Sequence, residues 1–392
     1  MPFKLEIDKS EEIEWVNTRR VDAISFKDCH ASLKIIDLFS GCGGLTLGLQ
    51  RAAEKMKMPL SVKFAIDLDQ DSLSTYKANF GNISENILCD DILNYFDYKE
   101  NSDLSAKELK LRENLGPIDI LVAGPPCQGH SDLNNHSRRD DPRNRLYLSC
   151  LQAIKITRPQ FVIIENVPTV IHSKENVVNI TKNVLIKIGY YLKELKVDFL
   201  RLGIPQTRKR HIMIASFDQE LIESIETDYK NEYNIATLEE FINDYEILNE
   251  NSLINKQSKI SEKNQARIEY LFTNDVFDLP DKLRPNCHRN KKHSYKSNYG
   301  RLHLSKPAQT ITSGFSSMGQ GRYVHPNYKR TLIPREAARI QGFPDFFSWQ
   351  TNSLTSLRRM IANAVPPQLT FQLGQFYIER NTNLVKVTQL VP

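Results

Sequence analysis

The sequence predicts an α/β fold, a sheet covered by helices on both faces, followed by a smaller and irregular domain. Three observations support this fold class: strand and helix patterns alternate from Leu33, the strands are near-continuous apolar runs, and the regular pattern ends after residue 217. Apolar runs of this kind are typical of strands buried on both faces of a sheet. The first 30 residues look like an N-terminal extension.

The individual elements follow from apolar runs and the residues that interrupt them. A strand, a glycine turn, a helix from about residue 45, a second strand and a helix ending near Phe80 form a βαβ unit. Pro334 favours the start of a short helix, and the apolar pattern after Pro367 predicts a C-terminal helix that returns to the first domain. The predicted strands are LKIIDLF at 33–39, VKFAID at 62–67, IDILVAG at 118–124, FVIIENV at 161–167 and HIMIASF at 211–217.

Composition excludes several classes of protein. The chain has 392 residues, of which 40% are hydrophobic and 25% charged, so it is neither collagen-like nor wholly disordered. No apolar run approaches the roughly 18 residues of a membrane span, and the charged N-terminus does not resemble a signal peptide. The six cysteines form no CxxC pair, which argues against a disulfide framework or a metal site. We therefore expect a globular protein of the cytoplasm.

Charge is distributed unevenly along the second half of the chain. Residues 217–282 hold 16 acidic and 6 basic residues, whereas residues 283–335 hold 11 Lys and Arg, four His and no acid. Tyrosine and phenylalanine side chains are interleaved with the basic ones, as contact with phosphates and unstacked bases would favour. Taken alone, a solvated basic face is the simpler interpretation of such a run.

A glycine turn at the end of the first strand is a candidate cofactor site. In the segment Asp37 to Leu45, three glycines allow the backbone to approach a ligand and expose N–H groups near a helix N-terminus. Asp67 ends the second strand, where a carboxylate can accept hydrogen bonds from ribose hydroxyl groups. Together they suggest a nucleoside-containing cofactor, although a tight turn without a ligand would look similar. The pattern is not GxGxxG, which disfavours a nicotinamide dinucleotide.

Cys127 is a candidate nucleophile. It follows the strand at 118–124 in the segment Gly124-Pro125-Pro126-Cys127-Gln128, where two prolines limit the freedom of the loop. A thiol held outside the sheet beside a cofactor pocket suits covalent catalysis. A buried, inert cysteine is the alternative.

Two further groups of residues belong to the same edge of the predicted sheet. Glu165 ends the strand at 161–167 and is a candidate acid, although a carboxylate in a salt bridge is an equally good interpretation. Arg208 and Arg210 precede the strand at 211–217, and alternation puts them on one side. They suit a ring carbonyl, a phosphate or Glu165 itself; an exposed basic strand end is the alternative.

With these segments in this order, the chain resembles the cytosine-5 DNA methyltransferases of bacterial restriction-modification systems, over most of residues 33–375. The similar motifs are Asp37 to Leu45, Pro125-Pro126-Cys127-Gln128, Glu165-Asn166-Val167, Gln206-Thr207-Arg208-Lys209-Arg210, Lys306 to Thr312, Gly342-Phe343-Pro344 and Asn363-Ala364-Val365-Pro366-Pro367.

The resemblance implies a Rossmann-like S-adenosylmethionine-dependent methyltransferase fold, with a doubly wound mixed sheet and a smaller target recognition domain. It assigns Cys127 to attack carbon 6 of cytosine, Glu165 to hold or donate a proton at ring nitrogen 3, and Arg210 and Arg208 to orient Glu165 and the ring. It assigns to the cofactor Phe39, Gly41, Gly43 and Leu45 for the methionine part, Asp67 for the ribose, Leu68, Asp91 and Ile92 for the adenine, and also Ser40, Cys42, Gly44, Gly124, Pro126, Leu146, Asn363, Ala364 and Val365.

The resemblance also implies the domains and partners. We expect an N-terminal extension at 1–30, a catalytic domain at 31–217, a target recognition domain at 218–325, and a hinge with a C-terminal return at 326–392. The expected partner is double-stranded DNA with a flipped cytosine, beside a possible cognate restriction endonuclease. Nothing requires a dimer, a metal or a membrane. The alternatives are a tRNA cytosine-5 methyltransferase of the same fold, a catalytically silent DNA-binding relative and, more distantly, a nicotinamide oxidoreductase.

Overall fold

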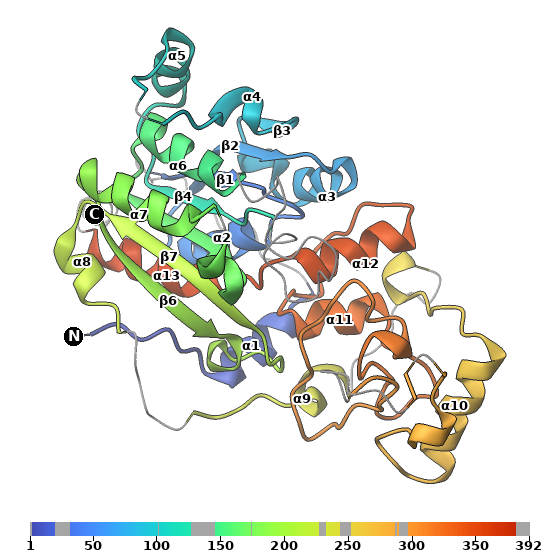
Figure 1. The fold of residues 1–392 in the computed structure, drawn as a ribbon. Coiled ribbons are helices and arrows are strands. Elements are labelled where there is room, and N and C mark those ends of the chain that lie inside the picture. The colour runs from blue at the N-terminus through green and yellow to red at the C-terminus, as the bar shows by residue number, and fades with distance from the viewer. Residues whose placement is uncertain are drawn as a thin grey trace.

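The computed structural model describes residues 2–19, 32–100, 102–126, 146–173, 175–226, 233–243, 252–286, 288–289 and 297–381. Within these residues the chain forms a large lobe around a central sheet and a smaller lobe of mostly irregular structure (Figure 1). No helix in this part of the chain is both long and apolar enough to span a membrane.

The central sheet has seven strands in the order β3-β2-β1-β4-β5-β7-β6. The pairs among β3, β2, β1, β4 and β5 are parallel, whereas β7 is antiparallel to both β5 and β6. The predicted α/β class with a mixed sheet is therefore confirmed. The strands are β1 (Leu33–Leu38), β2 (Leu60–Asp67), β3 (Ile87–Cys89), β4 (Ile120–Ala123), β5 (Phe161–Asn166), β6 (Tyr191–Asp198) and β7 (Lys209–Ser216).

Two strands, β3 and β6, were not predicted from the sequence. They are the two edge strands of the sheet. In β6 only Leu195 and Val197 are buried, because one side of an edge strand faces solvent, so the strand lacks a continuous apolar run. The alternation of these two apolar side chains with Glu194 and Lys196 was the available signal.

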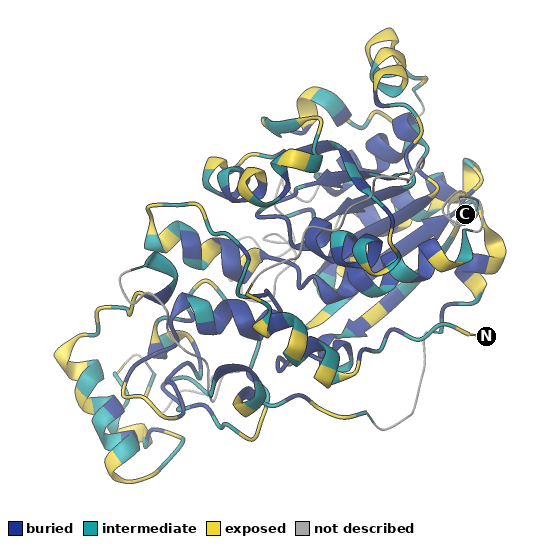
Figure 2. Ribbon diagram, turned by 180° about the vertical axis from the view of Figure 1, so that it is seen from behind, coloured by how far each residue is buried: buried dark blue, intermediate teal, exposed yellow. Residues whose placement is uncertain are grey.

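Helices cover both faces of the sheet, and the strand residues alternate between two hydrophobic cores. In β1, Ile35 belongs to one core and Ile36 to the other. The first core includes α2 (Gly44–Lys55) and α13 (Gln368–Arg380), and the second includes α6 (Leu146–Thr157) and α7 (Val177–Lys187). Figure 2 shows the strands as the most continuously buried part of the molecule. The other helices of the large lobe are α1 (Lys9–Asn17), α3 (Gln70–Phe80), α4 (Leu93–Phe96), α5 (Ala106–Leu115), α8 (Gln219–Glu223) and α12 (Leu354–Asn363).

The smaller lobe carries α9 (Leu238–Ile242), α10 (Glu262–Thr273) and α11 (Pro334–Ile340). Among the described residues of this lobe, strand pairing is limited to isolated bridges such as Arg301 with Val324. It has a small core of its own, formed by Ile268, Leu271, Leu279, Tyr299, Met318 and Val324. This agrees in character with the irregular second domain expected from the sequence, whose boundaries remain a prediction.

The N-terminal segment packs into the large lobe, although the sequence pattern suggested a mere extension. Glu12 in α1 is fully buried and accepts hydrogen bonds from Arg51 Nη1 at 2.5 Å and Gln368 Nε2 at 2.6 Å. The Arg51 guanidinium also lies over the ring of Trp15, 4.6 Å from its centre. A buried carboxylate that is paired in this way avoids the large cost of an isolated charge. Helix α1 is thereby attached to both α2 and α13.

The predicted C-terminal helix returns to the first domain and packs along α2. The close approach of α2 and α13 depends on Gly48 in α2, because a Cβ atom at this position would lie 2.0 Å from Pro367 O and 2.8 Å from Phe371 N. A third close contact involves Thr370, whose hydroxyl donates to Leu45 O at 2.7 Å. The two helices are therefore in backbone contact at the point where the chain enters α13.

A buried polar network supports the first strand. Asp37 is fully buried, and its Oδ2 accepts a hydrogen bond from Thr46 Oγ1 at 2.7 Å, while the Thr46 and Tyr76 hydroxyl oxygens are 2.8 Å apart. Burial raises the pKa of Asp37 to about 7, and the nearby negative charge of Asp67 adds to this rise. The protonated carboxyl group is thus the favoured form below neutral pH.

The Gly48 contact predicts the effect of a single methyl group. Gly48→Ala should lower the free energy of unfolding by about 2 to 3 kcal/mol, because the contacting atoms include backbone and cannot move aside cheaply. Urea denaturation followed by circular dichroism measures this. Gly81→Ala is the matched control, since its Cβ would have Lys77 Cγ, at 3.4 Å, as its nearest neighbour. Equal stability of the two variants would contradict the packing described.

The raised pKa of Asp37 predicts a pH dependence of stability. Between about pH 4 and 7 the unfolded chain has lost this proton while the folded chain retains it, so the free energy of unfolding falls as the pH rises. Asp37→Asn removes the ionisable carboxyl group and with it this contribution to the pH dependence of the free energy of unfolding. The stability of the variant relative to wild type should therefore increase over this interval, by at most about 4 kcal/mol. Urea denaturation at several pH values tests this, with the exposed Asp103→Asn as control; parallel curves for wild type and Asp37→Asn would contradict it.

Candidate functional site

The carboxyl ends of the parallel strands border one cavity of about 660 Å³. This volume is within the range of small-molecule and cofactor sites, and the position is where open α/β sheets bind ligands. The cavity brings together nearly all of the described residues that the sequence nominated: Phe39, Ser40, Gly41, Cys42, Gly44, Leu45, Asp67, Leu68, Asp91, Ile92, Gly124, Pro126, Leu146, Glu165, Arg208, Arg210, Asn363, Ala364 and Val365.

The glycine turn that begins the cavity has a strained backbone. Phe39, Gly41 and Gly43 all have positive φ angles, of 55°, 53° and 94°. For a residue with a side chain, such as Phe39, this costs on the order of 1 to 3 kcal/mol and is found mostly at functional sites. A Cβ atom on Gly41 would meet no atom within 4 Å, so this backbone faces open space.

Gly43 differs from the other residues of the turn. It is absent from the cavity lining, and a Cβ atom there would lie 2.2 Å from the ring of Phe80 in α3. The sequence resemblance assigned Gly43 to the methionine part of the cofactor. That assignment stays a prediction, and the structure shows that a glycine here allows the turn to pack against α3.

Asp67 holds the glycine turn in place. Its carboxylate accepts hydrogen bonds from Gly41 N and Asp69 N, each at 2.8 Å. Burial raises the pKa of Asp67, and these two backbone donors oppose the rise. The adjacent Leu68 is 72% exposed, which is unusual for a leucine and leaves an apolar surface beside the cavity.

The far end of the chain closes the cavity. Asn363, Ala364 and Val365 line it from the end of α12, and a Cβ atom on Gly44 would lie 2.2 Å from Val365 O. Glycine is therefore required at position 44 for the turn and the C-terminal segment to meet. The sequence predicted this return of the chain, and the structure shows the contact.

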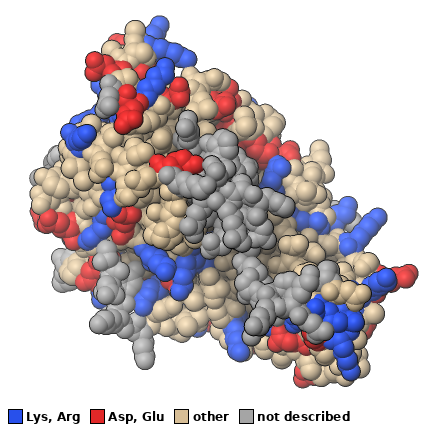
Figure 3. Space-filling view, viewed as in Figure 1, with Lys and Arg blue, Asp and Glu red and all other residues tan. Residues whose placement is uncertain are grey.

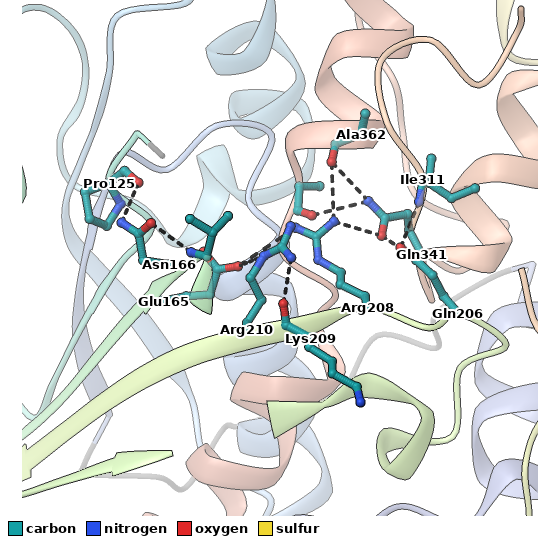
Figure 4. Close-up of polar contacts among 12 residues, drawn as sticks. Pro125, Glu165, Asn166, Gln206, Arg208, Lys209, Arg210, Ile311, Gln341 and Ala362 are labelled. Atoms are coloured by element: carbon teal, nitrogen blue, oxygen red, sulfur yellow. Dashed lines mark hydrogen bonds and ion pairs between the residues drawn. The ribbon is translucent and has the colours of Figure 1, made fainter. Parts of the chain in front are cut away.

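Glu165 and the two arginines form an ion-pair group at the other side of the cavity (Figure 4). Arg210 Nε lies 2.8 Å from Glu165 Oε1, and Arg208 Nη2 lies 3.9 Å from the same oxygen. Glu165 is 6% exposed and Arg208 2% exposed, so both charges are largely removed from water. Strand alternation thus places both guanidinium groups on one side of β7, as expected. The sequence left two interpretations of Glu165 open, a salt-bridged carboxylate and a catalytic acid. The structure shows the salt bridge, and the position of Glu165 in the cavity wall is also compatible with the role of an acid.

Cys127, the candidate nucleophile, lies outside the described residues, as does Gln128. The chain leading to Cys127 is described: Asn166 Nδ2 donates to Pro125 O at 3.3 Å, and Pro126 lines the cavity. Two other cysteines, Cys42 and Cys150, are buried, and burial raises the pKa of Cys42 to about 12 and that of Cys150 still further. Neither of these two thiols is suited to act as a nucleophile near neutral pH.

Several residues of the site were not nominated from the sequence. Asp69, at the N-cap of α3, and Arg359, in α12, line the cavity and form an ion pair of 2.7 Å across its rim. The N-cap signal of Asp69 was readable from the sequence, but its partner lies 290 residues away and was not. Asp90, Ser72, Met360 and Ala362 also line the cavity.

The basic stretch at 283–335 is more internally paired than its composition suggested. Arg301 lies 3.1 Å from Asp275, Arg322 pairs with Asp278, and Arg330 lies 2.6 Å from Glu336. Among the eight lysines and arginines of this stretch that the structure describes, Lys306 and Arg289 are exposed without an acidic partner, and Arg289 donates to the backbone oxygens of Lys282 and Arg284. The acidic segment before the stretch supplies the partners of Arg301 and Arg322, which gives part of that segment a structural role.

Comparisons with known proteins identify the family of the chain. The family model described as "C-5 cytosine-specific DNA methylase" matches residues 33–378. The chain is 41% identical to the type II methyltransferase M1.BsuMI of Bacillus subtilis, over 88% of this chain and 80% of that protein. It is 30% identical to the type II methyltransferase M1.HphI of Haemophilus parahaemolyticus, over 90% of this chain and 88% of that protein.

Solved structures share the fold. A prophage-encoded protein of Escherichia coli aligns with a TM-score of 0.58 and 26% identity, over 91% of this chain and 100% of that chain. A DNMT2 variant from Spodoptera frugiperda aligns with a TM-score of 0.59 over 88% of this chain and 100% of that chain; at 19% identity it bears on the fold alone. With its family model covering the sheet, the cavity and the C-terminal return, the chain belongs to the C-5 cytosine-specific DNA methylases and is a DNA (cytosine-5)-methyltransferase.

Proposed function

We propose that the chain transfers a methyl group from S-adenosylmethionine to carbon 5 of a flipped-out cytosine in a short DNA sequence, through a covalent bond to Cys127. The observation that carries this proposal is the single cavity, which joins the glycine turn and Asp67 to Glu165, Arg208 and Arg210. Cofactor and target base would therefore meet within one enclosed space.

The residues present fit the cofactor. The hydroxyl oxygen of Ser40 is buried in the cavity wall with no hydrogen-bond partner among the described residues, which suits a polar ligand group. Phe39, Gly41 and Leu45 would hold the methionine part and Asp67 the ribose. Exposed Leu68 would cover the adenine together with Asp91 and Ile92, and Asn363 and Val365 would close the pocket. When bound, S-adenosylmethionine supplies an electrophilic methyl group on its sulfonium sulfur.

The remaining residues would activate cytosine. Carbon 5 of cytosine is a poor nucleophile, and the bond from the Cys127 sulfur to carbon 6 makes carbon 5 electron-rich. Glu165 would donate a proton to ring nitrogen 3 as this bond forms, with Arg210 holding its carboxyl group and Arg208 beside the ring. Carbon 5 would then take the methyl group, with S-adenosylhomocysteine as the leaving group. A base would remove the proton from carbon 5, the Cys127 thiolate would leave carbon 6, and ring nitrogen 3 would return its proton to Glu165. The ring is aromatic again and the product is 5-methylcytosine.

The burial of this site supports base flipping. Glu165 lies in the cavity wall and is only 6% exposed, so a base that remains stacked in a duplex cannot reach it. We further propose that residues 31–217 form the catalytic domain, 218–325 the target recognition domain and 326–392 the hinge and return. The separate core of the smaller lobe supports this division.

The charge on the surface constrains how DNA is held. On the face seen in Figure 3, Lys and Arg lie in several separate groups with Asp and Glu between them, so the described residues present no continuous basic strip there. Exposed Lys306 is the described residue of the 283–335 stretch that we assign to a phosphate contact. Since both named relatives are type II methyltransferases, we propose that the chain serves a restriction-modification system with a cognate endonuclease.

The proposal predicts a sequence-specific mark in the cell. Genomic DNA from cells expressing the wild-type chain should carry 5-methylcytosine in one short motif, and DNA from cells expressing Cys127→Ser should not, because the variant cannot form the covalent bond. Bisulfite sequencing measures both. Unmodified DNA from the wild type, with transfer of labelled methyl to tRNA instead, would contradict the proposal and favour the RNA substrate.

Loss of the acid should slow transfer without weakening cofactor binding. Glu165→Gln keeps the shape of the side chain but cannot supply the proton, so kcat should fall by about 10² to 10⁴. Single-turnover transfer of tritiated methyl to DNA measures the rate, and calorimetry with S-adenosylhomocysteine measures binding. The control is Glu194→Gln, whose carboxylate contacts His211 at 2.8 Å on β7 but does not line the cavity. A similar fall of kcat in Glu165→Gln and Glu194→Gln would count against a role for Glu165 in proton transfer.

A further inference from the structure

We infer that Gln341 is a positioning residue for methyl transfer, because its buried amide group joins Arg208, on the target-base side of the cavity, to the Asn363–Ala364 segment on the cofactor side. The inference rests on the proposed function and adds a residue to it. Figure 4 shows the group of side chains that carries it.

The backbone of Gln341 is held firmly. The residue is the C-cap of α11, and its N–H donates to Ala337 O at 3.0 Å. The next residue, Gly342, has a φ of 77°, and its carbonyl accepts a hydrogen bond from Gln368 Nε2 at 3.0 Å. A left-handed glycine ends the helix here, as is common, and its carbonyl group is held by a side chain of α13. The Gln341 side chain is fully buried.

The amide nitrogen of Gln341 faces the end of α12. Nε2 donates to Ile361 O at 2.6 Å and lies 3.4 Å from Ala362 O and 3.3 Å from Ala364 O. The last carbonyl groups of a helix have no partner within the helix, so a buried helix end needs donors from elsewhere. Gln341 supplies this donor to the turn that leads into Asn363 and Ala364, which line the cavity.

The amide oxygen of Gln341 faces the segment before β7. It accepts a hydrogen bond from Gln206 Nε2 at 2.8 Å and a long one from Arg208 Nη1 at 3.5 Å. Arg208 Nη1 is also 3.5 Å from Ala362 O. Gln206 in turn accepts a hydrogen bond from Ile311 N at 3.0 Å, which continues the network into the smaller lobe.

This arrangement requires an amide in one orientation. Turning the amide over would place its oxygen against the carbonyl oxygens of α12 and its nitrogen against the donors of Gln206 and Arg208. A carboxylate keeps the acceptor and loses the donor, whereas a methionine of similar size has neither. Since Arg208 and Ala364 line the same cavity, a shift of either changes the distance between cofactor and base, and transfer rates are sensitive to such shifts.

Gln341→Met and Gln341→Glu test this in the full-length chain. For Gln341→Met we expect the Kd for S-adenosylhomocysteine to rise by about tenfold and kcat, at saturating cofactor and DNA, to fall by about tenfold to a hundredfold, while KM for DNA changes little. For Gln341→Glu we expect part of the cofactor affinity to return, relative to wild type, as the pH falls from about 8 to about 6, because a protonated carboxyl regains one donor.

The control is Gln152→Met. Gln152 is also a buried glutamine, 1% exposed, and donates to Glu108 at 2.6 Å on α6, where it does not line the cavity. It should lose stability but keep Kd and kcat. If Gln341→Met loses stability alone, with Kd and kcat as in wild type, the inference is overturned and Gln341 is structural. If the wild type itself neither binds S-adenosylhomocysteine nor methylates DNA, the proposed function fails and the inference falls with it.

Discussion

The docking of α13 on α2 is the contact on which the site depends. Gly48 permits the two helices to touch through their backbones, and the entry of the chain into α13 then places Val365 against the glycine turn at Gly44. The cavity is therefore built from segments that lie more than 300 residues apart. Neither segment encloses a ligand without the other, because each supplies one wall.

Charge is separated within this cavity. The side bordered by the ends of β2 and β3 carries Asp67, Asp69, Asp90 and Asp91, with Arg359 at the rim, whereas the side bordered by β5 and β7 carries Arg208, Arg210 and Glu165. A cationic sulfonium cofactor suits the first side, and an electron-rich base that accepts hydrogen bonds suits the second. On the second side, the buried guanidinium of Arg208 also has a polar neighbour in the amide oxygen of Gln341, 3.5 Å away.

The smaller lobe shows how charge composition can mislead. Its run of basic residues suggested an extended phosphate-binding surface, but Arg301, Arg322 and Arg330 are held by acidic partners in the fold. Guanidinium groups that are paired in this way connect loops that have little regular secondary structure. Fewer basic side chains of this lobe are therefore free of acidic partners than its composition indicated.

The sequence by itself determined the α/β class, the buried central strands and most of the candidate site. This was possible because these features are local: apolar runs define strands, and the glycine turn, Asp67 and Glu165 each end one. It missed the edge strands β3 and β6, because β6 buries only Leu195 and Val197 and has no continuous apolar run. It also treated α1 as an extension, although Glu12 is buried. The contact of Arg210 with Glu165 was among the expectations from the sequence and is present in the structure. Only the tertiary structure decided that Arg359 pairs with Asp69 and that Gln341 joins two walls of the cavity. These contacts join residues far apart in the chain, and a local pattern carries no information on which distant partner will satisfy a buried polar group.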